Sequence, residues 1–234
     1  MIFIPYIVYK DYTMKKGEFK ESEFMANFNP LSPEVAYTLG FFWADGYISQ
    51  SQGSRNNNVR IEIAEADGEN LKEIFCKFIP WKLYYRKRKG RKNQIAFNVT
   101  DGYFKKWLLE MGFGMKSFNS PNNILNHLNR FSIYFLRGLI DGDGCIYIGN
   151  KSNNQLSITS TFEQDWSYME EFCLTRGIKF SIKRTENKSG KSSQFRITNK
   201  PGIKMIYKEL YLETKLPGMG LHRKINKFKE IYNS

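Results

Sequence analysis

The chain has 234 residues, 41% of them hydrophobic and 16% aromatic, which suffices for the core of one large or two small domains. Lysine and arginine total 36 against 23 aspartates and glutamates, so the net charge is +13 and a nucleic-acid partner is expected. The chain has only two histidines and three widely spaced cysteines, too few for histidine catalysis, a zinc site or a disulfide framework. The cysteines are expected to be buried, reduced thiols.

Residues 1–31 have no counterpart elsewhere in the chain and are predicted to form an N-terminal extension. Its apolar start, residues 1–9, is too short to cross a bilayer and lacks both a basic region and a small-residue cleavage site. No arginine precedes Arg55, which disfavours a mitochondrial presequence. We therefore expect an intracellular protein without a membrane partner, cytoplasmic if encoded by a bacterium or phage and organellar if encoded by an organelle.

The first helix is predicted to begin at Ser32, an N-cap residue followed by Pro33 in the first turn. Its body, residues 35–43, is hydrophobic on nearly all sides, which is typical of a helix buried between two subdomains. Next, the patterning predicts strands at 47–49 and 59–64, a helix at 68–78, strands at 82–88 and 94–100, and a helix at 102–111.

An asparagine-rich stretch containing Pro121, residues 117–129, is predicted to link two halves. The same series then recurs, with strands at 145–148 and 156–159, a helix at 163–175, strands at 179–184 and 194–198, and a helix at 201–211. The chain is therefore predicted to be an α+β protein of two pseudo-symmetric α-β-β-α-β-β-α halves with antiparallel sheets, residues 32–116 and 130–234.

A nine-residue segment occurs twice, as TLGFFWADG at 38–46 and as LRGLIDGDG at 136–144, offset by 136 − 38 = 98 positions. Each copy has small residues at its third and seventh positions, which lie on one helical face and allow two helix backbones to approach closely. The glycine at the ninth position is expected to end each helix with a positive φ. We therefore expect the two segments to pack as paired helices.

An aspartate precedes the final glycine of each segment, Asp45 in the first and Asp143 in the second. Paired helices would place these carboxylates side by side, where they repel unless a cation lies between them. A divalent metal is the expected cation. The second segment also contains Asp141, which aligns with Trp43 and cannot share the helical face of Asp143, so we expect a solvated or capping carboxylate there.

LRGLIDGDG resembles the signature of the LAGLIDADG homing endonucleases, from which it differs at two letters. TLGFFWADG is a looser match that agrees at Gly40, Ala44, Asp45 and Gly46. The resemblance extends from about Ser32 to the C-terminus. It implies a monomer whose motif helices pair between two sheets, with the sheets forming a saddle on double-stranded DNA. The implied activity is site-specific cleavage of both strands across the minor groove, each acid serving one strand and leaving short 3′ overhangs.

The resemblance also implies Mg²⁺ as the cofactor, with Mn²⁺ able to replace it and Ca²⁺ supporting DNA binding without cleavage. The predicted metal site comprises Asp45 and Asp143 together with their neighbours Ala44 and Gly142. Phosphodiester hydrolysis needs a positioned water and charge neutralisation at the phosphate, which carboxylate-held metal provides without histidine.

The family often places a lysine near each scissile phosphate, after the last helix of each half. The matching segments here are residues 112–116 and 220–224, so the resemblance nominates Lys116 and Lys224 as catalytic residues. The alternative for both lysines is a generic contact with a phosphate.

The strands are predicted to hold DNA on one face, because the period of two gathers polar and basic residues there. A β-ribbon fits the major groove, where arginine and lysine can read guanine and asparagine or glutamine can read adenine. The alternative is an ordinary solvated sheet face. Since the halves differ at most of these positions, we expect a pseudo-palindromic or asymmetric target of about two helical turns. The predicted contacts are Arg60, Lys82, Tyr84, Arg86, Arg88, Gln94 and Asn98 in the first half, and Lys179, Ser181, Lys183, Thr185, Gln194, Arg196 and Thr198 in the second.

Two other functions remain open at this point. An RNA maturase, which assists intron splicing with intron RNA as its partner, can use the same fold and does not need the acids. A DNA-binding regulator derived from a nuclease would be expected to have lost one acid, whereas both are present here. A mobile gene, either intron-encoded or free-standing, is favoured, and the target sequence and host cannot be derived from the residues.

Overall fold

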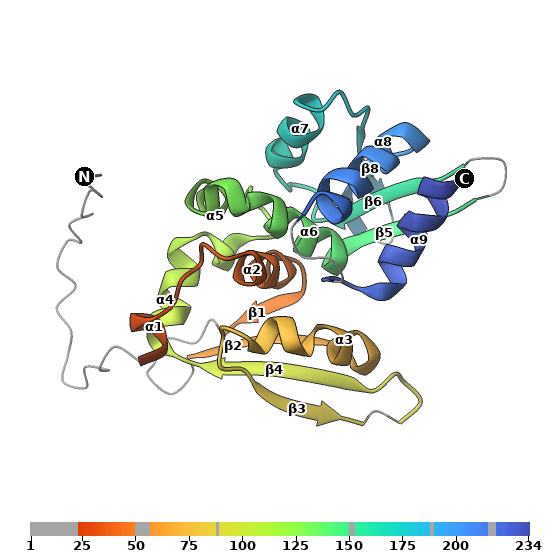
Figure 1. Ribbon diagram of the computed structural model, residues 1–234. Coiled ribbons are helices and arrows are strands. Elements are labelled where there is room, and N and C mark those ends of the chain that lie inside the picture. The colour runs from red at the N-terminus through yellow and green to blue at the C-terminus, as the bar shows by residue number, and fades with distance from the viewer. Residues whose placement is uncertain (1–22, 50–56, 88, 150–152, 188–189, 215–218) are drawn as a thin grey trace.

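A computed structural model describes residues 23–49, 57–87, 89–149, 153–187, 190–214 and 219–234. Two sheets lie on opposite sides of a central pair of helices (Figure 1). The chain up to the end of the first half comprises α1 (Glu23–Ala26), α2 (Pro33–Asp45), β1 (Gly46–Ile48), β2 (Asn58–Ala64), α3 (Glu65–Cys76), β3 (Lys82–Arg86), β4 (Gln94–Thr100), α4 (Gly102–Glu110) and the 3₁₀ turn η1 (Phe113–Met115).

The connection and the second half repeat this series. They comprise α5 (Asn122–Leu128), the 3₁₀ turn η2 (Asn129–Phe131), α6 (Ser132–Asp143), β5 (Gly144–Tyr147), β6 (Gln155–Ser160), α7 (Ser167–Leu174), β7 (Ser181–Asn187), β8 (Gly190–Ile197), α8 (Lys200–Tyr207), the π-helical turn η4 (Lys208–Leu212) and α9 (His222–Asn233).

Each sheet has four antiparallel strands, in the order β1-β2-β4-β3 in the first half and β5-β6-β8-β7 in the second. Phe97 of β4 pairs with Ile61 on one side and Leu83 on the other, and Phe195 of β8 takes the equivalent place 98 residues later. The predicted fold class, α+β with two related halves and two antiparallel sheets, is therefore confirmed.

The first motif helix, α2, forms where the sequence predicts it. The Ser32 hydroxyl accepts a hydrogen bond of 3.3 Å from the backbone N–H of Val35, and Pro33 occupies the first turn. All residues from Val35 to Trp43 are buried. The helix has apolar neighbours on every side because α6 covers one face while α3 and the first sheet cover another (Figure 1).

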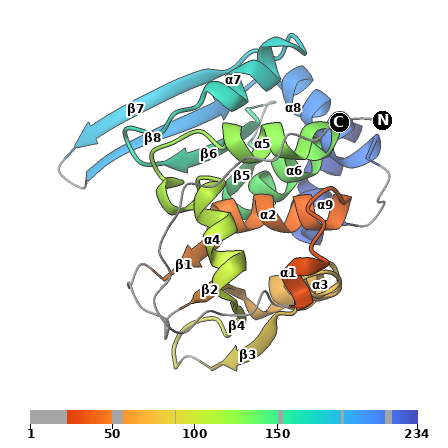
Figure 2. The same cartoon turned by 90° about the vertical axis from the view of Figure 1, so that its left-hand side faces the viewer.

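The small residues of the two motifs form the seam between α2 and α6, which lie side by side in both views (Figure 2). A Cβ added to Gly40 would overlap the backbone carbonyl of Phe135, and one added to Gly138 would overlap that of Tyr37. The backbones therefore touch, as the four-residue spacing predicts, and the pairing of the motif helices is confirmed.

The glycines that end the motif helices differ from expectation. Gly46 and Gly144 have φ values of −74° and −68°, so the prediction of positive φ is wrong. Glycine is needed there for space, because a Cβ on Gly46 would overlap the Phe42 ring and one on Gly144 would lie 3.0 Å from a methyl group of Ile140. The chain turns back so tightly into each first strand that no side chain fits.

Several predicted boundaries shift. The helix expected at 68–78 begins at Glu65, and the one expected at 163–175 is shortened to Ser167–Leu174. The strand expected at 179–184 runs instead from Ser181 to Asn187. The helix expected at 201–211 ends at Tyr207 and continues as the π-helical turn.

The stretch 117–129, predicted as a linker, contains α5. Ile124 and Leu128 are four residues apart, fully buried, and together anchor this helix on the core. Ahead of α2, part of the predicted N-terminal extension also packs: Phe24 and Phe28 each lie with their ring 5.4 Å from that of Phe104. Residues 1–22 of the extension lie outside the described part.

The cysteines only partly fit the expectation of buried thiols. Cys76 and Cys173 lie on the equivalent helices α3 and α7, and Cys173 is buried, but Cys145 on β5 is exposed. Among the helices that the structure describes, none is both long and apolar enough to cross a membrane.

Candidate active site at the end of the paired helices

Asp45 and Asp143 are the last residues of α2 and α6, at the same end of the seam. A Cβ placed on Gly142 would lie 3.6 Å from Oδ2 of Asp45, so the first acid reaches across to the second helix. The pKa of Asp143 is raised to about 6, first by desolvation and then by the negative charge of Asp45. Desolvation also raises the pKa of Asp45. The duplicated motifs thus bring two acids within electrostatic reach of each other.

Lys116 lies against the C-terminal end of α2. Its ammonium group donates hydrogen bonds of 2.8 Å to the carbonyl of Ala44 and 3.3 Å to that of Phe42. The Phe42 carbonyl also accepts the backbone N–H of Gly46, and both carbonyls lie at the negative end of the helix dipole, which a cation stabilises.

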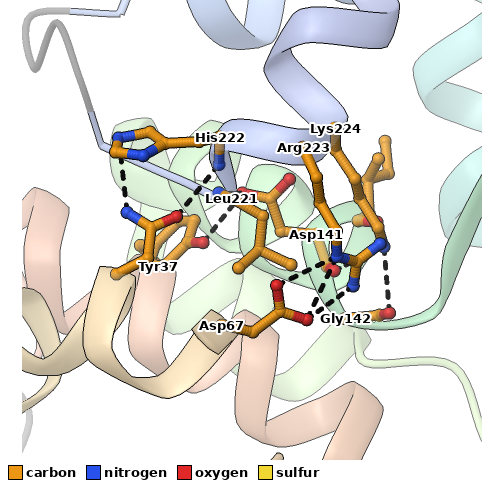
Figure 3. Close-up of polar contacts among 10 residues, drawn as sticks. Tyr37, Asp67, Asp141, Gly142, Leu221, His222, Arg223 and Lys224 are labelled. Carbon is orange, nitrogen blue, oxygen red and sulfur yellow. Dashed lines mark hydrogen bonds and ion pairs between the residues drawn. The ribbon is translucent and has the colours of Figure 1, made fainter. Parts of the chain in front are cut away.

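Lys224 occupies the equivalent place at the end of α6. It is buried, and its ammonium group donates to the carbonyls of Ile140 at 2.8 Å and Gly142 at 3.0 Å, and also to that of Asp141 (Figure 3). The two lysines nominated from the sequence therefore cap the two motif helices in the same way.

Burial lowers the pKa of each lysine to about 8. The acids oppose this shift, because Asp143 and Asp45 both raise the pKa of Lys116, while Asp141 leads the groups that raise that of Lys224. Near neutral pH most of the molecules carry both ammonium charges. The site therefore holds two carboxyl groups and two ammonium groups close together. The ammonium groups contact the carbonyls at the ends of the two motif helices.

Asp141 is not the solvated or capping carboxylate expected from the sequence, and this prediction is wrong. It is fully buried and accepts a hydrogen bond of 2.7 Å from the hydroxyl of Tyr211. It also accepts hydrogen bonds from the Tyr37 hydroxyl at 2.8 Å and from the backbone N–H of Leu221 at 3.1 Å (Figure 3). The face of α6 opposite Asp143 is covered by η4 and by the segment before α9, which supply the donors Tyr211 and Leu221, while Tyr37 donates from α2.

Arg137 is buried beside this carboxylate and was missed from the sequence. Its guanidinium lies 4.6 Å from the centre of the Tyr211 ring and donates a 2.9 Å hydrogen bond to the Thr214 hydroxyl. Desolvation raises the pKa of Asp141, against the hydrogen bonds of Tyr211 and Tyr37 and the charges of Lys224 and Arg137. The available signal was an arginine inside an apolar helix, four residues before an aspartate.

The donor set at the end of the seam fits a hard divalent cation. Asp45 and Asp143 supply carboxylate oxygens, and the carbonyls of Ala44 and Gly142 each keep a second lone pair besides the one that a lysine uses. No group of three or more histidine, cysteine, aspartate or glutamate side chains suited to a metal occurs in the described residues. Such a site matches Mg²⁺, which takes one or two carboxylates, with water and phosphate as further ligands.

The predicted DNA contacts of the first half share one sheet face. Phe97 and Ile95 point to α3, where a Cβ on Gly68 would meet both, so Asn98 and Gln94 point the other way. Across the strands, Asn98 lies between Arg60 and Lys82, and Gln94 lies opposite Arg86. Tyr84 is exposed on the same face, and Arg88 lies outside the described residues.

The second half has an equivalent face. Arg196 pairs across the strands with Ser181 and Gln194 with Lys183, while Thr185 lies further out along β7. Lys179 and Thr198, expected within strands, lie just outside them and are exposed.

Residues on the same faces were also missed. Tyr47 pairs with Arg60 and is 60% exposed, and Tyr147 on β5 is 57% exposed. Glu62 lies on the face of the first sheet and forms ion pairs with Arg60 and Arg86, the latter at 3.4 Å. The strand period that places Arg60 on this face also places Glu62 there, two residues further along β2.

The chain is similar to known proteins both in sequence and in fold. Residues 130–211 match the family described as the LAGLIDADG-like domain. An uncharacterized protein of Methanocaldococcus jannaschii is 27% identical over 176 residues, in a match that covers 71% of this chain and 62% of that protein. The chain thus spans less than two thirds of the length of this curated relative.

Solved structures extend the likeness to both halves. The homing endonuclease I-WcaI bound to its DNA recognition sequence is 20% identical with a TM-score of 0.54, and the match covers 83% of this chain and 90% of that chain. I-DmoI in complex with DNA and Ca is 15% identical with a TM-score of 0.54, and the match covers 86% of this chain and 100% of that chain. This chain therefore has the fold of these endonucleases.

Proposed function

We propose that this chain, whose residues 130–211 match the LAGLIDADG-like domain and whose fold is that of solved homing endonucleases, is a site-specific endonuclease. It cleaves both strands of double-stranded DNA with a divalent metal, at a long asymmetric or pseudo-palindromic target. The observation that carries this proposal is the convergence of Asp45, Asp143, Lys116 and Lys224 at one end of the helix seam. A regulator or maturase has no chemical need for such a constellation.

The sheet faces support DNA as the partner. Side-chain oxygens of Gln94 and Asn98 have no hydrogen-bond partner among the described residues, although they are shielded from water. Amides with spare hydrogen-bonding capacity beside Lys82 and Arg86 suit the edges of bases and the phosphates next to them. I-WcaI, whose fold this chain shares, was solved bound to its DNA recognition sequence.

In this mechanism the residues of each half serve one strand. The carboxylates of Asp45 and Asp143 would hold the cation at the end of the helix seam, next to the scissile phosphates. When bound, the metal neutralises charge at the phosphate and lowers the pKa of the attacking water. Lys116 and Lys224 stabilise the negative charge that builds up on the phosphate, from positions fixed by the helix-end carbonyls. Mg²⁺ is the proposed ion, with Mn²⁺ as a substitute.

The test is cleavage of a target duplex, found in the DNA that flanks the gene or selected from a random library. Asp45→Asn and Asp143→Asn keep the size of each side chain but remove the charge that holds the cation. Both variants should bind the duplex with near-native affinity and cleave it at least about a thousandfold more slowly, since transition-state electrostatics of this kind contributes several kcal/mol. Ca²⁺ in place of Mg²⁺ should allow binding with little cleavage.

The alternatives make different forecasts. Cleavage by both Asn variants at the wild-type rate would sink the nuclease mechanism. If the wild-type protein instead cut no duplex but promoted splicing of intron RNA equally well with and without the acids, the maturase function would replace it.

A further inference from the structure

The segment that carries Lys224 belongs to the second half but is held by the first half. Arg223 donates to both carboxylate oxygens of Asp67 on α3, with distances of 3.0 and 3.1 Å from Nε and 2.8 Å from a terminal nitrogen (Figure 3). Next to it, the backbone N–H of His222 donates 2.9 Å to the side-chain oxygen of Asn70, also on α3. The first turn of α9 is thus fixed to a helix that lies more than 150 residues away in sequence.

The opposite arrangement occurs at the other lysine. The chain just after Lys116 is held by second-half residues that precede α7: the backbone N–H of Asp165 donates 3.1 Å to the carbonyl of Phe118, and the Gln164 amide donates 2.9 Å to that of Asn119. Each half therefore anchors the lysine-bearing segment of its partner half. At Lys116 the anchors are bonds to backbone, whereas at Lys224 the main anchor is an ion pair between side chains.

We propose that Asp67 is a positioning residue for Lys224, acting through Arg223, and that it controls cleavage of one DNA strand only. This inference rests on the proposed nuclease function. Asp67 is one-fifth exposed and its bond to Arg223 is a planar, two-pronged ion pair, a geometry that fixes orientation as well as distance. Arg223 is the immediate neighbour of Lys224, so a change in its direction rotates the helical turn from which the lysine reaches the carbonyls of α6.

The expected effect is on geometry more than on stability. An ion pair with one partner 57% exposed contributes little to the free energy of folding. Misplacement of a catalytic group by about 1 Å, in contrast, reduces a rate by up to about a hundredfold. Loss of Asp67 should therefore leave a folded protein that still binds DNA but cuts one strand slowly.

The experiment follows both strands separately, in single-turnover cleavage of a target duplex labelled on each strand. Asp67→Asn should slow one strand by about 10- to 100-fold, so that nicked duplex accumulates, while DNA affinity stays within about twofold of wild type. The slowed strand must be the same one that Lys224→Met slows. The double exchange Asp67→Arg with Arg223→Asp restores the pair in reverse and should recover much of the lost rate.

A matched control removes an ion pair at the opposite end of α2 from Asp45. Glu34→Gln breaks the 2.5 Å pair with Lys77, which is about as exposed as the pair of Asp67 with Arg223, and should leave both strands at the wild-type rate. The proposal is overturned if Asp67→Asn slows both strands equally, slows the strand that depends on Lys116, or slows neither. Failure of the nuclease function itself is distinguishable, because then the wild-type protein cuts neither strand under any of these conditions.

Discussion

The two halves hold their candidate active-site lysines, Lys116 and Lys224, with the same backbone turn but with different side-chain interactions. Gly112 and Gly220 each lie four residues before the lysine, and both have positive φ, 94° and 114°. A side chain from the sixth position of the motif lies beside each turn. In the first half it is Trp43, whose ring meets that of Phe113 edge-on with centroids 4.9 Å apart.

In the second half the sixth position is Asp141. A Cβ on Gly220 would lie 2.6 Å from its carboxylate, which also accepts the N–H of Leu221, the counterpart of Phe113. An aromatic contact tolerates small shifts of the two rings, whereas a buried carboxylate with three donors fixes one arrangement and is destabilising when a donor is lost. The repeat has therefore kept the geometry around each lysine while the interactions that enforce it have diverged.

The change that should affect both halves equally is a larger residue in the seam. Gly40→Val and Gly138→Val each push a side chain into the backbone of the opposite helix, so both should unfold the protein or destabilise it by about 3 kcal/mol or more. Thermal unfolding measures this. Gly114→Ala is the control, because its Cβ meets only the flexible end of Leu109. A variant that stays native in one seam position but not in the other would show that the halves are not packed as equivalents.

Replacing one lysine at a time should separate the contributions of the two halves of the site to cleavage. Lys116→Met and Lys224→Met remove the cation but keep the length of the side chain, and each should slow one strand by about a hundredfold or more while affinity changes little. Single-turnover rates measured beside equilibrium binding separate these effects. Equal losses of rate and affinity would reduce both lysines to ordinary phosphate contacts.

Smaller changes test the divergence at the sixth motif position. Asp141→Asn keeps the shape but turns an N–H₂ group toward a tyrosine hydroxyl, which should destabilise the protein by about 1–3 kcal/mol. Trp43→Phe leaves an aromatic ring that can still contact Phe113, so its effect should be smaller. Urea unfolding of both variants gives the comparison. If Trp43→Phe were the more damaging change, packing would matter more than the carboxylate in fixing these segments.

Much of the fold could be predicted from the sequence, because each helix or strand assigned in one half can be checked against its counterpart in the other half. Phe97 and Phe195, 98 positions apart, take equivalent places in their sheets, and the small residues of both motifs meet at the seam. Local periodicity also separates the faces of each strand. Helix α5 was missed because its apolar pair, Ile124 and Leu128, is too short a pattern to distinguish from a polar linker.

Less of the candidate site could be foreseen. Spacing correctly indicates that Asp141 and Asp143 point in different directions, but it cannot show which residues pack against Asp141. The groups that do so, Tyr211 and Leu221, come from 70 and 80 residues further along the chain. The ion pair of Asp67 with Arg223 spans 156 residues and leaves no periodic trace.

The subtlest prediction contrasts Asp143 with Asp141 on the same helix. The pKa of Asp143 is raised to about 6, above the ordinary value of about 3.9, so the folded protein favours its protonated form. Ionisation of this acid therefore weakens folding: the destabilisation is absent below about pH 4, where the folded and unfolded forms are both protonated, and is complete above about pH 6. Asp143→Asn should accordingly unfold at higher urea concentration than wild type at pH 7, with the difference vanishing at pH 4. Desolvation raises the pKa of Asp141 as well, but Asp141→Asn should be less stable than wild type at pH 7, because its N–H₂ group would face a tyrosine hydroxyl that now donates to the carboxylate. If both variants were less stable than wild type to the same extent at pH 7, the charge of Asp143 would not destabilise the folded protein. Asp143 would then be an ordinary structural carboxylate, and its position would not have been kept for binding a cation at a cost in stability.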